Sequence, residues 1–267
     1  MSDPGLAVGV FDSGVGGLTV LKQLTVRLPS VSTIYLGDTA RVPYGTKSAD
    51  TVVRYAIACA RLLIDRGVQL LIVACNTASA FALDHLKKTL NIPVIGVIEP
   101  GARAAVSATQ NNRIGVIGTA GTIRSNAYQH AILALQPNVE IISRPCPLFV
   151  PLADEGWTEG EVPHAIAATY LKEMREAEVD TLVLGCTHYP LLKPVIADVM
   201  GNNVTLIDSA EAASAAEETI LNEFGPVEDR SDAQHRFLVT DAPETFRRIS
   251  ERFLGHVIEN VEWVDVA

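Results

Sequence analysis

AVGVFDSGVGGLTV, residues 7–20, consists of a continuous apolar run, a glycine-rich turn and the start of an amphipathic segment. The apolar run predicts a buried strand, and LTVLKQLTVRL (18–28) has the spacing of a helix. The same alternation continues with a strand at 32–38, a helix over about 49–66 and a strand at 70–75. Continuous β-branched runs between helices are typical of a parallel sheet covered on both faces. The chain is therefore expected to have an α/β fold.

Two parts of the chain are similar at a nearly constant offset. RIGVIGTAGTI (113–123) repeats the order of the opening stretch, and Gly118 lies 106 positions after Asp12. TLVLGCTHYP (181–190) repeats LLIVACNTAS (70–79), and its cysteine lies 111 positions after the earlier one. This indicates an internal duplication. We expect two similar pseudo-symmetric lobes, each a largely parallel sheet flanked by helices, with the active site in the cleft between them.

The C-terminal segment breaks this symmetry, because it has no counterpart after residue 97. We expect it to return to the first lobe, which gives a discontinuous N-terminal lobe of residues 1–97 and 208–267 and a second lobe of residues 98–207. The expected elements are a helix at 209–225, a polar turn-rich stretch at 226–234, a strand at 236–241, a helix at 243–254 and a strand at 261–266. The charged part of that last helix, PETFRRISERF (243–253), is expected to be a solvated face.

The composition limits the function classes. The chain has 267 residues and a formal net charge of −10, so it lacks the basic surface that binds nucleic acid. It has neither a basic and apolar leader at its N-terminus nor about 18 uninterrupted apolar residues, as a membrane helix needs. The four cysteines are scattered, unlike those of a disulfide framework. We expect a cytoplasmic protein with reduced thiols and with neither nucleic acid nor membrane as a partner.

Two cysteines stand out by their position. Cys75 and Cys186 each follow a predicted buried strand and sit at or just before a helix, for which Asn76 or Thr77 is the expected N-cap at the first site. Unpaired N–H groups at a helix N-terminus stabilise a thiolate, so we expect pKa values below the usual value of about 8.5. Two lobes facing each other would oppose the sulfurs across a cleft, which suits proton exchange on both faces of a stereocentre. Cys59 and Cys146 are expected to be small core residues.

The loop FDSGVGGLT (11–19) allows a competing interpretation as a dinucleotide-binding turn, with Asp38 as the ribose-binding acid. Against it, Thr19 replaces the last glycine of that motif, and Asp12 would place a carboxylate beside the pyrophosphate. Alternatively, Asp12 and Ser13 face the cleft. A nicotinamide-dependent oxidoreductase thus stays as an alternative class.

His188, two residues after Cys186, could be part of a metal site or could share a proton with the thiol. The other histidines stand alone in the sequence, so we expect no metal site. Polar groups at converging strand ends are what carboxylate groups of a small substrate require.

Six segments together give a resemblance over essentially the whole chain to the glutamate racemases of the aspartate/glutamate racemase family. They are GVFDSGVGGLTV (9–20), LGDTARVPYG (36–45), ACNTAS (74–79), GVIGTAGT (115–122), CPLFVPL (146–152) and LGCTHYPLL (184–192).

The resemblance implies cofactor-independent interconversion of L- and D-glutamate that supplies peptidoglycan synthesis, with neither a cofactor nor a metal, and a homodimer as in many members. It implies that Cys75 and Cys186 are the acid/base pair, with Asp12, His188 and Glu155 as their helpers. The residues implied to hold substrate are Asp12, Ser13, Tyr44, Gly45, Asn76, Thr77, Thr187 and His188. Two further alternatives stay open: racemisation of aspartate, and inhibition of DNA gyrase by binding, a role known for some members.

Overall fold

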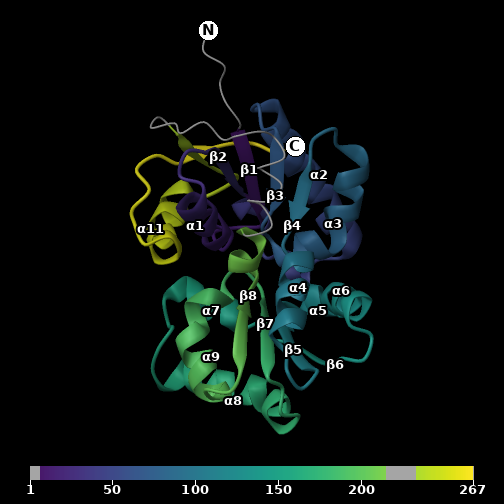
Figure 1. Cartoon of the computed structure of the whole chain (residues 1–267). Coiled ribbons are helices and arrows are strands. Elements are labelled where there is room, and N and C mark those ends of the chain that lie inside the picture. The colour runs from purple at the N-terminus through teal and green to yellow at the C-terminus, as the bar shows by residue number, and fades with distance from the viewer. Residues whose placement is uncertain (1–6, 215–232, 267) are drawn as a thin grey trace.

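The structure, a computed structural model, describes residues 7–214 and 233–266. Figure 1 shows two lobes, one above the other, each built around its own sheet. In the part of the chain described, no helix is both long and apolar enough to cross a membrane.

The first sheet contains strands from both ends of the chain. Its order is β10-β9-β2-β1-β3-β4, and every pairing is parallel. The strands are β1 (Ala7–Asp12), β2 (Ser32–Gly37), β3 (Leu70–Val73), β4 (Val94–Gly96), β9 (His235–Val239) and β10 (Glu262–Trp263).

Helices cover both faces of this sheet because successive side chains of a strand point to opposite faces. Val8 and Val10 of β1 pack into one core with α1 (Leu18–Arg27) and α11 (Pro243–Leu254). Phe11 packs into the opposite core with α2 (Ala49–Asp65) and α3 (Asn76–Thr89). Such strands are apolar on both faces, which explains the continuous runs in the sequence.

The second sheet has the order β6-β5-β7-β8, and all its pairings are parallel. Helices α4 and α6 pack against one face, and α7, α8 and α9 against the other. The strands are β5 (Arg113–Gly118), β6 (Glu140–Pro145), β7 (Thr181–Gly185) and β8 (Thr205–Asp208). The helices are α4 (Ile98–Ala108), α5 (Ala120–Arg124), α6 (Ala127–Leu135), α7 (Phe149–Glu155), α8 (Glu161–Glu176) and α9 (Lys193–Met200).

The two sheets have the same core topology. In each, the first strand along the chain lies between the second and the third, and the fourth follows the third, as in β2-β1-β3-β4 and β6-β5-β7-β8. This confirms the predicted α/β fold of two similar lobes. The C-terminal strand β9 joins the first sheet by pairing with β2. The residues at which the lobes divide stay a prediction.

Several predicted boundaries need correction. The strand at 70–75 ends at Val73, and Cys75 itself, rather than Asn76 or Thr77, is the N-cap residue of α3. The strand predicted at 261–266 spans only Glu262–Trp263. Most of the predicted helix at 209–225, and most of the polar stretch after it, lie outside the described residues.

We expect Leu71→Ala to lower the free energy of unfolding by about 2–5 kcal/mol, because Leu71 is fully buried on an interior strand of the first sheet and the truncation leaves a cavity. The midpoint of urea unfolding measures this loss. Val26→Ala is the control, since Val26 is 72% exposed and its truncation should change stability by less than about 0.5 kcal/mol. Equal losses in the two variants would contradict this account of the core.

Candidate active site

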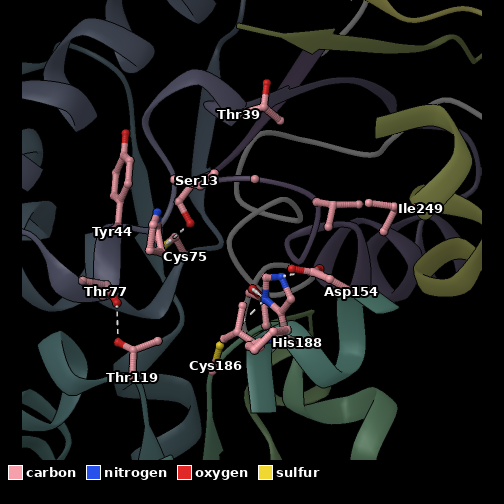
Figure 2. Close-up of a pocket in the computed structure, with 18 of the residues that line it drawn as sticks. Ser13, Thr39, Tyr44, Cys75, Thr77, Thr119, Asp154, Cys186, His188 and Ile249 are labelled. Carbon is pink, nitrogen blue, oxygen red and sulfur yellow. Dashed lines mark hydrogen bonds and ion pairs between the residues drawn. The ribbon is translucent and has the colours of Figure 1, made fainter. Parts of the chain in front are cut away.

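A cavity of about 390 Å³ lies between the lobes and is lined by residues of both. Figure 2 shows Cys75 entering it from the first lobe and Cys186 from the second. Active sites of parallel sheets gather at the carboxyl ends of the strands, and this cavity lies where β3 and β7 end. Of the predicted site residues, the structure brings together Cys75, Cys186, Ser13, Tyr44, Gly45, Asn76, Thr77, Thr187 and His188.

Cys75 is a buried thiol at the start of α3. Its Sγ lies 3.5 Å from the hydroxyl of Ser13, to which it donates a hydrogen bond. Burial and, to a smaller extent, the nearby charge of Asp12 raise the pKa of Cys75 to about 12, although the Ser13 hydroxyl and the Ala78 N–H oppose this shift. The expectation of a Cys75 pKa below the usual value is wrong, because desolvation of the sulfur outweighs the lowering by the helix N-terminus.

Cys186 occupies the equivalent place after β7, but its surroundings differ. No α-helix starts at once; a turn leads into a 3₁₀ helix at Tyr189–Leu192 before α9. The Sγ of Cys186 lies 3.9 Å from Nδ1 of His188. The second cysteine is therefore paired with an imidazole, whereas the first is paired with a hydroxyl.

His188 connects Cys186 to a carboxylate. Its Nε2 lies 3.2 Å from Oδ1 of Asp154, in an ion pair between a buried ring and a half-buried acid. Burial alone would lower the pKa of His188, but Asp154 and Cys186 raise it to about 10. The ring is therefore an imidazolium at neutral pH.

The structure corrects the prediction for Glu155. Glu155 is exposed at the C-terminal end of α7 and does not line the cavity, whereas its neighbour Asp154 lines the cavity and contacts His188. One residue along a helix turns a side chain by about 100°. The acid that faces the cavity is thus Asp154.

Asp12 lies behind the cavity wall and does not line it. Its carboxylate is fully buried, where it accepts a 2.9 Å hydrogen bond from the N–H of Gly14 and a 3.5 Å bond from the Thr187 hydroxyl. Burial raises its pKa, although His188 opposes this shift. Asp12 can act on the site through Thr187 and the field it exerts on Cys75, but the structure does not present it to a ligand.

The lobes meet at three hydroxyl groups beside the cavity. Thr77 of the first lobe lies 2.9 Å from Thr119 and 3.0 Å from Thr122 of the second lobe, measured between the hydroxyl oxygens. Thr119 lines the cavity and was missed from the sequence. The duplication was a signal for it, since Thr119 lies 106 positions after Ser13.

Helix α11 forms an apolar wall of the cavity through Phe246 and Ile249. The expectation that its charged segment is only a solvated face is therefore wrong. The arginines at 247 and 248 stay exposed, but the apolar residues three or four positions apart turn inward.

The two thiols that line one cavity agree with the proteins to which the chain is similar. The sequence profile of the Asp/Glu/hydantoin racemases matches residues 18–216. A glutamate racemase of Geobacter metallireducens is 56% identical to this chain over 98% of both proteins. The chain belongs to the glutamate racemase family. No group of three or more His, Cys, Asp or Glu side chains suited to a metal ion is found among the residues described.

Solved structures of glutamate racemases have the same fold. Isoform RacE1 of Bacillus anthracis superposes with a TM-score of 0.94 at 41% identity, over 98% of each chain. The enzyme of Francisella tularensis, solved in complex with D-glutamate, gives a TM-score of 0.92, also at 41% identity and 98% coverage of each chain. The arrangement of two lobes around one pocket is therefore that of the glutamate racemase fold.

The raised pKa of His188 predicts a pH dependence of stability. The pKa of an unfolded histidine is about 6.5, so the raised pKa of His188 stabilises the folded chain fully below that pH. This stabilisation is lost as the pH rises through about 10, the folded value. We expect the urea midpoint of the unmodified chain to fall between these pH values more steeply than that of His188→Asn. Parallel curves for the two proteins would contradict the assignment of the imidazolium.

Proposed function

We propose that Cys75 and Cys186 are the two bases of a cofactor-independent glutamate racemase, one acting on each face of the substrate Cα. The observation that carries this is that the thiols follow equivalent strands, β3 and β7, of two similar sheets and line one cavity. Inversion by proton exchange needs a base on one face and an acid on the other. In this proposal both proton carriers are side chains and no cofactor takes part.

In this mechanism one cysteine, as a thiolate, removes the Cα proton, and the other, as a thiol, returns a proton to the opposite face. Negative charge develops on the α-carboxylate meanwhile. The N–H groups at the start of α3, with the side chains of Asn76 and Thr77, are placed to stabilise it. Ser13, Gly45 and Thr187 complete the polar lining that would hold the ammonium and carboxylate groups.

The two sides of the pocket use different helpers. On one side Ser13 accepts the hydrogen bond of the Cys75 thiol, and the Asp12 carboxylate lies behind it. On the other side the His188 imidazolium, paired with Asp154, stabilises negative charge on Cys186. By resemblance to the family, Cys186 exchanges the proton of L-glutamate and Cys75 that of D-glutamate.

We further propose that the product, D-glutamate, supplies peptidoglycan synthesis in the cytoplasm, where the four free cysteines would stay reduced. Glutamate is preferred to aspartate as substrate because the family relatives are glutamate racemases and one of them is solved with D-glutamate. The predicted homodimer stays a prediction, for which light scattering of the purified chain is the measurement.

Isotope incorporation tests the two-base mechanism. In deuterated water, product formed early should carry deuterium at Cα while recovered substrate does not, because the abstracting thiol holds the substrate's own proton. Cys75→Ser and Cys186→Ser should each lower racemisation by roughly 10²- to 10⁴-fold, since a serine hydroxyl is far too weak an acid to replace the thiol. NMR of Cα and circular dichroism measure these outcomes. Equal labelling of substrate and product from the first turnovers would indicate a single base.

Adjacent substitutions test which acid serves His188. We expect Asp154→Asn to lower kcat by up to about 100-fold with a smaller change in KM, because His188 loses the group that orients and charges it. Glu155→Gln is the matched control and should keep normal kinetics, since Glu155 is exposed. The reverse result would return the helper role to Glu155.

A further inference from the structure

Helix α11 belongs to the first lobe but reaches the catalytic side chains of the second. The ring of Phe253 meets the imidazole of His188 edge to face, with centroids 5.3 Å apart and planes at 83°. The guanidinium of Arg252 donates a hydrogen bond to the backbone carbonyl of Asp154. In Figure 1 this helix lies directly above α7, and in Figure 2 it borders the side of the site that holds Asp154 and His188.

Phe253 fixes the plane of the His188 ring. Nδ1 of His188 faces Cys186 and Nε2 faces Asp154, so rotation of the ring would break both contacts at once. Phe253 is 2% exposed and stands almost perpendicular to the ring, in a core that allows little movement. Its removal would free the ring to turn.

Arg252 fixes the backbone that carries Asp154. The last carbonyls of a helix have no intrahelical partner, and a cation near them is favourable. At the end of α7, Arg252 supplies a hydrogen-bond donor to such a carbonyl and a positive charge beside it. Its side chain packs so closely against this turn that a Cβ on Gly156 would lie 3.0 Å from its Nε. Oδ1 of Asp154 is buried and takes no hydrogen bond from the described part of the chain, apart from its ion-pair contact with His188. The position of this carboxylate therefore depends on the backbone that Arg252 holds.

We propose that Arg252 and Phe253 are positioning residues for proton transfer at Cys186, acting from the opposite lobe through Asp154 and His188. Neither residue lines the cavity, so neither touches substrate. Both contacts are on the Cys186 side, which makes the expected effect one-sided. The proposal rests on the proposed function, because it concerns the base on one face of the reaction.

Kinetic isotope effects with Cα-deuterated L- and D-glutamate test the proposal. His188→Asn serves as the benchmark, because it removes the imidazole that assists proton transfer at Cys186. This variant shows for which enantiomer the isotope effect on kcat/KM rises when proton transfer at Cys186 is impaired. Arg252→Gln and Phe253→Leu should raise the isotope effect of the same enantiomer and lower kcat by about tenfold, below the roughly 100-fold that a misplaced catalytic group can cost. KM should stay nearly unchanged.

Arg247→Gln is the matched control on the same helix, since Arg247 is exposed and pairs only with the exposed Glu244 among the contacts described. It should keep normal kinetics and isotope effects. Arg252→Gln is also the variant that preserves the core, because its side chain is exposed whereas Phe253 is buried. Isotope effects of Arg252→Gln that equal those of Arg247→Gln, or that rise for the other enantiomer, would overturn the proposal.

A second readout does not require racemase activity. Labelling by iodoacetamide, followed by peptide mass spectrometry, reports the reactivity of Cys186 and Cys75 separately. Arg252→Gln should slow labelling of Cys186 but not of Cys75, because the imidazolium beside Cys186 is displaced. Equal labelling of Cys186 in Arg252→Gln and Arg247→Gln would overturn the proposal. An unmodified chain that fails to racemise glutamate would overturn the proposed function, and the labelling would still decide the role of Arg252.

Discussion

The close approach of the two lobes at Gly16 determines the rest of the site. A Cβ on Gly16 would lie 2.3 Å from the hydroxyl of Thr187 and 2.4 Å from the ring of His188, so only glycine fits there. A similar contact brings Gly45 against Thr119, where a Cβ would lie 2.5 Å from that side chain. Each lobe supplies one thiol, and these close contacts bring the two strand edges together around the cavity.

Burial determines the charge state on one wall of this cavity but not on the other. It favours the neutral thiol at Cys75, where the charge of the Asp12 carboxylate also opposes ionisation. At His188 the same burial is outweighed by Asp154 and Cys186, so the ring stays positive. Two similar lobes thus provide chemically different environments for the two faces of one substrate. The duplication supplies the positions of the thiols, and the residues around them supply the asymmetry.

The sequence predicted most of the fold and the positions of both thiols, because strand periodicity and the repeat can be recognised from the order of residues alone. The predictions from sequence were wrong where the outcome depends on which way a helix residue faces or on how far a group is removed from water. The position of Asp154 rather than Glu155 depends on the turn of a short helix, which a motif match does not resolve. The pKa of Cys75 depends on how fully the folded chain excludes water from its sulfur, which no single segment encodes. The inward face of α11 was visible in the spacing of Phe246, Ile249 and Phe253 but was outweighed by its charges.

The first sheet joins the two ends of the chain, and this imposes an order on synthesis at the ribosome. The strand β2 is among the first to emerge, but its outer edge pairs with β9, which begins only at His235. All four strands of the second sheet have been translated once Asp208 is made. Between the translation of Asp208 and that of His235, the outer edge of β2 has no partner strand in the nascent chain. An unpaired strand edge of this type can associate with other chains. The lobe that begins first along the message is therefore the last to be completed.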